Sequence, residues 1–267
     1  MRRDMRREME TFKVWARSVL TLLFRRECLI CHRELRGFEK NLCTHCMADL
    51  PLSFTWCSER SEADLGFYGR AYVEKVTSLL IYRGKFKELL YQLKYKGHIS
   101  IGIMLGRMLG SKLFLQESSQ QSTEKAEQRQ YLVVPVPLHW LKQMKRGYNQ
   151  SAVLAKGVVK NLRERGIEAR LCQGVLRRRR FTETQTVRDR LSRWQNVQRA
   201  FTINPNRLHR LLETNISAVN RAHQAEPLHF ILVDDVLTTG ATLDACANLL
   251  LKNCRCTVTI ATAAFVP

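Results

Sequence analysis

A short apolar strand that runs straight into two acids constrains this chain more than any other feature of its sequence. Residues 230–233 are fully apolar, which is typical of a strand buried on both faces of a parallel sheet. Asp234 and Asp235 follow, then small hydroxyl residues around Gly240, and then the apolar spacing of a helix over 243–251. Ligands of open α/β sheets bind beyond the carboxyl ends of the strands, so this junction is the first candidate site.

The hydroxyl-rich turn at residues 238–242 has the composition of an anion-binding loop. Its backbone N–H groups and threonine hydroxyls would surround an anion at a helix N-terminus. Two carboxylates beside that anion would repel phosphate alone, but they suit a ligand that also carries hydroxyl groups or a magnesium ion, such as a sugar phosphate with a free diol. The alternative is structural, with the acids serving only as a helix cap and a turn. The chain has no G-x-x-x-x-G-K-[ST] motif, so a P-loop NTPase is not supported.

From residue 131 onward, apolar strands alternate with helices, which favours a parallel sheet with helices on both faces. In this part we expect helices over 151–162 and 243–251, and strands over 131–137, 169–176, 200–203, 230–233 and 257–265. Upstream we expect a strand over 76–82 and helices over 86–93 and 99–115. Gly102, Gly106 and Gly110 recur every four residues in the last of these, which indicates close helix packing. The polar segments 116–130 and 204–227 are interpreted as insertions.

The length of 267 residues suits one large domain, or a medium domain with a small module, and 45% hydrophobic content excludes wholesale disorder. No apolar run reaches the ~18–20 residues of a membrane-spanning helix. Residues 1–27 begin with basic residues like a signal peptide, but Asp4, Glu8 and Glu10 interrupt that region and no cleavage site follows. We therefore expect an amphipathic helix in a cytoplasmic protein, with a role at a membrane surface as the alternative.

Four of the nine cysteines form two close pairs, Cys28 with Cys31 and Cys43 with Cys46. Two such C-x-x-C knuckles can complete a tetrahedral zinc site of four thiolates. Such a site leaves no ligand position open, so we expect a structural role, in a module that does not fold without metal. The neighbouring His32 and His45 are alternative ligands.

The formal net charge is +20, and residues 142–199 carry 16 Lys and Arg against 4 Asp and Glu. Within this stretch, residues 177–180 are four consecutive arginines. Three interpretations stay open: a solvated surface, a mobile loop that closes over pyrophosphate, or a track for a nucleic-acid backbone.

Residues 233–242 (VDDVLTTGAT) resemble the phosphoribosyl pyrophosphate (PRPP) motif of type I phosphoribosyltransferases. The resemblance implies that Asp234 and Asp235 are the catalytic pair and hold the ribose 2′ and 3′ hydroxyls, with Mg²⁺ bound together with PRPP. It assigns the 5′-phosphate to the loop residues Thr238, Thr239, Gly240, Ala241 and Thr242.

Further segments resemble the ComF family, which is associated with DNA uptake in competence. They are residues 134–139, residues 145–150 and a later block around residues 185–201, and the paired cysteines complete the layout. The resemblance covers about residues 28–267. It implies an α/β, parallel-sheet, type I phosphoribosyltransferase-like fold with a small N-terminal zinc-finger module. The implied pyrophosphate loop comprises Pro137, Leu138, His139, Lys145 and Arg146, and the implied flexible basic loop contains Arg180, Gln185, Arg193 and Asn196.

Several cations near these segments have two interpretations. Lys142, Lys145 and Arg146 could neutralise a diphosphate, or could form a solvated helix face. Lys94 and Tyr95 could face the site, or could simply end a helix where cations are favoured.

We therefore expect an amphipathic helix over 1–27, a zinc-binding module over 28–60 and a phosphoribosyltransferase-like domain over 71–267 that contains the two insertions. Two functional hypotheses follow. In one, the chain binds PRPP and transfers its phosphoribosyl group to an acceptor that the sequence does not identify. In the other, it is a non-enzymatic cytoplasmic adapter that binds single-stranded DNA through its basic loop. PRPP or a related sugar phosphate, single-stranded DNA and other DNA-uptake proteins are the expected partners.

Overall fold

The computed structural model describes residues 26–53, 73–120, 130–179, 200–219 and 228–267. The side chains of 116–120 and 214–219 are not described. The chain divides into two compact units, residues 1–50 and 51–267, and each is described by itself. The helix expected over residues 1–27 lies almost wholly outside the described residues and stays a prediction.

The second unit is built on a sheet of five parallel strands, in the order β1-β7-β6-β2-β3. These strands are β1 (Lys75–Ile81), β7 (Cys256–Phe265), β6 (Leu228–Leu237), β2 (Tyr131–Pro135) and β3 (Ala169–Leu171). Most residues of β2, β6 and β7 are buried, because a central parallel strand is covered on both faces. The predicted α/β architecture with a parallel sheet is therefore confirmed.

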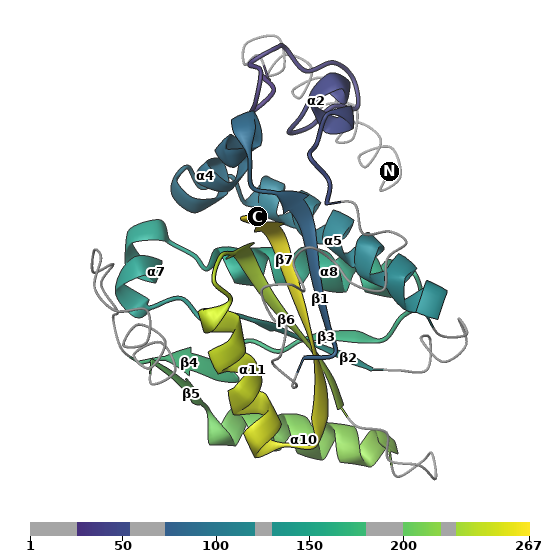
Figure 1. The fold of residues 1–267 in the computed structure, drawn as a ribbon, viewed down its shortest axis with the longest axis vertical. Helices are drawn as coiled ribbons and strands as arrows, with labels where there is room; N and C mark the ends of the chain where they lie inside the picture. The colour runs from purple at the N-terminus through teal and green to yellow at the C-terminus, as the bar shows by residue number, and fades with distance from the viewer. Residues whose placement is uncertain (1–25, 54–72, 121–129, 180–199, 220–227) are drawn as a thin grey trace, which may run out of the picture. The chain divides into compact units, whose positions relative to one another are not determined.

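Helices cover both faces of the sheet (Figure 1). The helices α5 (Ile99–Gln120) and α8 (Gln150–Glu164) pack on one face. On the other face lie α11 (Ala241–Asn253), the antiparallel hairpin of β4 (Leu176–Arg178) and β5 (Phe201–Ile203), and α10 (Pro205–Val219). Shorter elements precede them: the 3-10 turn η1 (Gly84–Phe86), α4 (Lys87–Tyr95) and α7 (Trp140–Arg146). Alternate residues of the central strands, such as Phe230 and Leu232, join side chains of α10 and α11 in one buried core.

The glycine spacing in α5 serves a close crossing with α8, as predicted. A Cβ on Gly157 would lie 2.5 Å from the carbonyl oxygen of Ile103 and 2.8 Å from the Cα of Gly106. No side chain fits between these two backbones, so glycine is required on both helices.

Part of the polar sequence is helical where we expected insertions. Within 204–227, residues 205–219 form α10, whose Leu208 and Leu211 are buried. No helix was predicted there, although these leucines lie three residues apart and form the buried side of a polar helix. Likewise α5 continues to Gln120, five residues into the segment 116–130.

Two predicted strands have different limits in the structure. The strand expected over 169–176 is two strands, β3 and β4, separated by a turn at Gln173 and Gly174, where Gly174 has φ = 75°. The strand expected over 230–233 continues to Leu237, so both aspartates lie inside β6.

Candidate functional site

The candidate site lies at the carboxyl end of β6, where the strand places Asp234 and Asp235 side by side. The hydroxyl of Ser151, in the first turn of α8, donates to Oδ1 of Asp234 at 2.8 Å. The same oxygen accepts the backbone N–H of Asp235, also at 2.8 Å. The start of α8 is fixed here because Asn149 caps it, its side chain accepting from the N–H of Ser151 at 3.0 Å. We expected this helix over 151–162, and it begins one residue earlier, at Gln150.

The surroundings of the Asp234 carboxyl make its ionised form unfavourable. Removal of the carboxyl from water and the adjacent charge of Asp235 together raise the pKa of Asp234 from 3.8 to about 7. The hydrogen bond from Ser151 and the charge of Lys94 act in the opposite direction and are weaker. Near neutral pH this carboxyl can therefore be either protonated or ionised.

Asp235 has two side-chain partners from other elements. The ammonium of Lys94, in the last turn of α4, lies 3.2 Å from Oδ2 of Asp235. The side-chain amide of Gln150, at the start of α8, donates to the same oxygen at 3.2 Å. Lys94 thus faces the site, which decides between its two interpretations.

The loop after β6 leads into an exposed helix start. Thr238 and Thr239 are exposed, and the buried Gly240 has φ = 72°, a backbone conformation that favours glycine. Gly240 is also the N-cap residue of α11, and no side chain caps this helix. The first N–H groups of α11 and the positive end of its dipole therefore face the loop, which is the arrangement that binds anions.

Cations gather beside the two aspartates. Arg178, on β4, is partly buried; burial lowers its pKa, and electrostatic interactions with Cys246 and Asp234 partly counter that effect. Burial and the charges of Arg178, Arg146 and Lys94 together lower the pKa of Lys142, on α7. These side chains come from three separate elements, β4, α7 and α4, and lie close enough to influence one another.

The residues of the predicted pyrophosphate segment differ in their burial and in their contacts. His139 is buried and caps α7, its Nδ1 accepting from the N–H of Leu141 at 3.3 Å. The guanidinium of Arg146 lies over the ring of Tyr95, 5.1 Å from its centroid. Pro137 and Leu138 are partly buried, and Lys145 is exposed. Of the two cations in this segment, Arg146 lies near Lys142, whose pKa its charge helps to lower.

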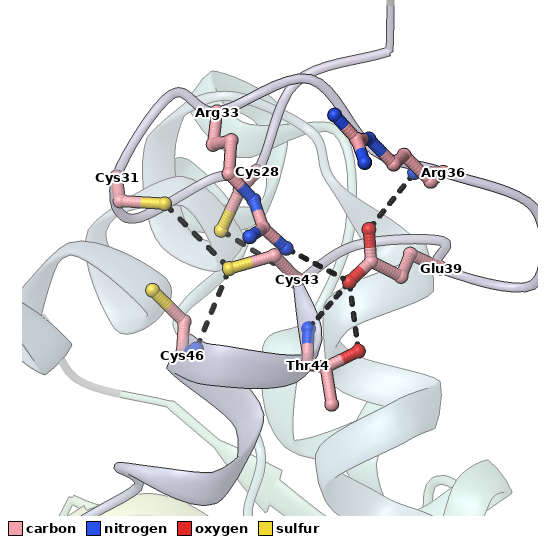
Figure 2. A network of polar contacts seen from close by, with 8 residues as sticks. All are labelled: Cys28, Cys31, Arg33, Arg36, Glu39, Cys43, Thr44 and Cys46. Atoms are coloured by element: carbon pink, nitrogen blue, oxygen red, sulfur yellow. Dashed lines mark hydrogen bonds and ion pairs between the residues drawn. The ribbon is translucent and has the colours of Figure 1, made fainter.

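A second candidate centre lies in the first unit, where the four paired cysteines come together. The Sγ atoms of Cys28, Cys31, Cys43 and Cys46 all lie within 4.8 Å of one another (Figure 2). Backbone N–H groups donate to two of the sulfurs. The N–H of Cys43 donates to Sγ of Cys28, and the N–H of Cys46 donates to Sγ of Cys43, both at 3.4 Å. Such N–H groups stabilise thiolates, so this cluster can hold a metal ion such as zinc.

Glu39 fixes the chain around this cluster (Figure 2). Its carboxylate accepts from the N–H of Arg36 at 2.8 Å and from the N–H and hydroxyl of Thr44 at 2.6 and 2.8 Å. It also pairs with Arg33 at 3.2 Å. These hydrogen bonds lower the pKa of Glu39 to about 2. Through Thr44, Glu39 holds the start of helix α2 (Thr44–Ala48), which carries Cys46.

The chain is similar to bacterial proteins named for competence and DNA utilization. It is 26% identical to competence protein F of Haemophilus influenzae over 230 residues, 84% of each chain. It is 26% identical to the DNA utilization protein YhgH of Escherichia coli over 233 residues, 87% of each chain. A YhgH of Salmonella typhimurium is 28% identical over 187 residues, 70% of each chain. These relatives support the resemblance to the ComF family. No family model matches the chain.

The site includes residues that the sequence did not single out. Gln150, Ser151 and Arg178 approach the aspartates from elements far away in sequence. Ser151 was predicted only as the first residue of a helix, and Arg178 only as one of four arginines. Their role depends on where α8 and β4 meet the end of β6, which no local pattern encodes.

Other predictions lie outside the described residues. Arg180, Gln185, Arg193 and Asn196 of the flexible basic loop stay predictions. Among the described helices, none is long and apolar enough to cross a membrane.

Proposed function

We propose that this protein binds PRPP, or a closely related sugar phosphate, at the carboxyl end of β6. The observation that carries the proposal is the direct succession of Asp234 and Asp235, the loop 238–240 and the uncapped start of α11. One ligand with a diol at one end and a phosphate at the other satisfies both halves of this arrangement.

The two carboxylates suit ribose hydroxyls. Oδ1 of Asp234 and Oδ2 of Asp235 accept hydrogen bonds from within the protein, while the second oxygen of each accepts none from the described residues. Those oxygens would accept the 2′ and 3′ hydroxyls. The same oxygen donors fit Mg²⁺, which prefers carboxylate and phosphate ligands and would neutralise the charge of the diphosphate.

The cations supply the remaining part of the ligand site. Lys94 pairs with Asp235, and Arg178 interacts with the charge of Asp234. Lys142 lies near both of these cations, and we infer that the three together would receive a diphosphate on C1 of the ribose. The burial of Arg178 makes its charge more effective than a solvated one, because less water screens it. The 5′-phosphate would accept hydrogen bonds from the N–H groups and hydroxyls of residues 238–242.

We further propose that bound PRPP is a substrate and that the protein transfers its phosphoribosyl group. Such a transfer displaces diphosphate from C1 through an oxocarbenium-like state, so the protein must position the donor and stabilise the leaving group. Asp234 and Asp235 would hold the ribose, and Lys94, Lys142 and Arg178 would stabilise the departing diphosphate. The acceptor is not part of this proposal.

The biological setting that we propose is the handling of DNA taken up from outside, on the cytoplasmic side. The relatives support it, since one is named a competence protein and others DNA utilization proteins. Other proteins of DNA uptake are the partners that this setting implies. For the cluster of Cys28, Cys31, Cys43 and Cys46 we propose a structural zinc ion.

Calorimetric titration tests the proposed ligand site. PRPP with Mg²⁺ is titrated into the wild-type protein and into Asp234→Asn and Asp235→Asn, with ribose 5-phosphate and pyrophosphate as separate partial ligands. We expect PRPP to bind more tightly than either part, and each variant to lose about 1.5–3 kcal/mol, roughly 10- to 100-fold. Asp49→Asn, at an exposed residue of the first unit, is the matched control. A folded, metal-loaded wild-type protein that does not bind PRPP would overturn the proposal.

A further inference from the structure

Two cysteines of the second unit, Cys254 and Cys256, take no part in the sites described above. They flank Arg255 where α11 ends and β7 begins, at the other end of α11 from the loop 238–240. Both are partly exposed, whereas Cys172 and Cys246, the other cysteines of this unit that the structure describes, are buried. We call Cys254 and Cys256 the C-x-C pair.

The backbone on each side of Arg255 is fixed by hydrogen bonds. Cys254 is the C-cap residue of α11 and is extended, with φ = −156° and ψ = 155°, and its N–H donates to the carbonyl oxygen of Leu250. Cys256 is the first residue of β7 and pairs with Leu228 of β6. Residues two apart along an extended chain place their side chains on the same face. The fold therefore presents the two thiols together.

The two thiols interact with each other and differ in acidity. A side-chain hydrogen bond from Cys256 lowers the pKa of Cys254, and the same interaction raises the pKa of Cys256. In its neutral form the Cys254 thiol donates to the carbonyl oxygen of Leu250 at 3.2 Å, a bond that ionisation breaks. The ionised sulfur accepts from Cys256 instead, so Cys254 is the better nucleophile of the two.

The spacing of the C-x-C pair fits a disulfide, but a strained one. An extended chain rises about 3.3 Å per residue, which puts Cα atoms two residues apart at roughly 6.6 Å. Disulfides join Cα atoms about 4.4–6.8 Å apart, so this spacing lies at the long end of their range. Strained and accessible disulfides are easily reduced, which suits reversible oxidation better than a permanent structural bond.

We propose that the C-x-C pair is a reversible thiol–disulfide modification site that reacts with a low-molecular-weight disulfide such as oxidised glutathione. The Cys254 thiolate attacks one sulfur of the reagent, whose S–S bond breaks, and the first glutathione leaves as a thiolate that takes up the proton lost by Cys254. The Cys256 thiolate then attacks Sγ of Cys254 and displaces the second glutathione, which takes up the proton lost by Cys256. Two protein thiols are oxidised and one glutathione disulfide is reduced to two thiols. The proposal does not depend on PRPP binding.

Incubation of the full-length protein with oxidised and reduced glutathione at several ratios tests the site. Remaining thiols are then alkylated under denaturing conditions, and intact mass and peptide mapping locate every modified cysteine. We expect a disulfide that links Cys254 to Cys256 within one chain and that dithiothreitol reverses. Cys172 and Cys246 are internal controls, because burial raises the pKa of both thiols and should leave them unmodified at the same ratios.

Two single variants separate the two steps. Cys256→Ser removes the resolving thiol but keeps a hydroxyl donor beside Cys254, so glutathione should stay attached to Cys254. Cys254→Ser removes the attacking thiol, and Cys256 should take up glutathione at least about tenfold more slowly than Cys254 does in Cys256→Ser. A wild-type pair that stays reduced in excess oxidised glutathione, a lasting glutathione adduct on wild-type Cys254, or disulfides that link two chains would each overturn the proposal.

Discussion

The ammonium of Lys94 lies 3.2 Å from Oδ2 of Asp235 and joins the last turn of α4 to the acidic end of β6. The preceding residue is also fixed, since the hydroxyl of Tyr148 donates to the carbonyl oxygen of Leu93. The ion pair places a cation against carboxylates that would otherwise repel each other. Lys94 therefore has a role in the protein without ligand, besides its proposed role beside the diphosphate.

Replacing Lys94 should make the acidic pair harder to ionise. The charge of Lys94 lowers the pKa of Asp234, so Lys94→Gln should raise that pKa above about 7. Carboxyl carbon chemical shifts followed by NMR across a pH titration would measure it. Lys252→Gln, far along the chain and exposed, should leave the titration unchanged. An Asp234 pKa that stays the same or falls in Lys94→Gln would contradict the ion pair.

Asp234→Asn should stabilise the fold at alkaline pH. The folded pKa of about 7 lies above the unfolded value of 3.8, so between these values the folded state keeps a proton that the unfolded state has lost. The free energy of unfolding of the wild type therefore falls as the pH rises through this window, and the loss is complete above it. Asparagine is neutral throughout and keeps an oxygen for Ser151.

Urea denaturation at two pH values measures whether the free energy of unfolding changes in this direction. At pH 8 the variant should be more stable than the wild type by on the order of 2–4 kcal/mol, whereas at pH 4 the two should be close. A variant that is less stable than the wild type at both pH values would show that the charged carboxylate is not costly in the fold.

Removal of metal should unfold the first unit. Described residues 26–50 hold little apolar core apart from the four-cysteine cluster, so metal binding would supply most of their folding free energy. We expect one zinc per chain by elemental analysis, lost in Cys46→Ser but kept in Cys254→Ser, which lies outside the cluster. Rapid protease cleavage within residues 26–50 should accompany loss of metal. Metal-free protein that resists cleavage there would contradict the structural role.

Gly157→Ala should destabilise the protein, although the same change usually stabilises a helix. The new Cβ would lie 2.5 Å from the carbonyl oxygen of Ile103, so α5 and α8 would have to separate. We expect a loss of about 1–3 kcal/mol in thermal or urea unfolding. Gly110→Ala, where the nearest atom is at 3.0 Å, should cost less. A stabilised Gly157→Ala variant would show that the helices do not meet this closely.

The sequence predicted those features that a local pattern encodes. The apolar run before Asp234 predicted a buried strand, and the cysteine spacing predicted a cluster of four thiols, since each depends on neighbours within a few residues. The polar helix α10 was missed because its buried leucines are few among charged residues.

Contacts between distant segments could not be predicted in the same way. Lys112, in the middle of α5, is buried and donates to the carbonyl oxygens of Ser53 and Ser78, at 2.8 and 2.7 Å. A lysine in a helix ordinarily indicates a solvated face, and only the packing of α5 on β1 shows otherwise. The contacts of Ser151 and Arg178 at the site likewise join segments that are distant in sequence, so no local pattern predicts them.

We propose that the end of β6 binds a phosphorylated ribose through two different kinds of group. Electron density from crystals grown with PRPP and magnesium would show whether it does. We predict the ribose 2′ and 3′ oxygens within hydrogen-bonding distance of Asp234 and Asp235, and the 5′-phosphate at the backbone N–H groups of residues 239–242. PRPP bound elsewhere on the protein, or a ribose turned away from both aspartates, would rule out this binding mode.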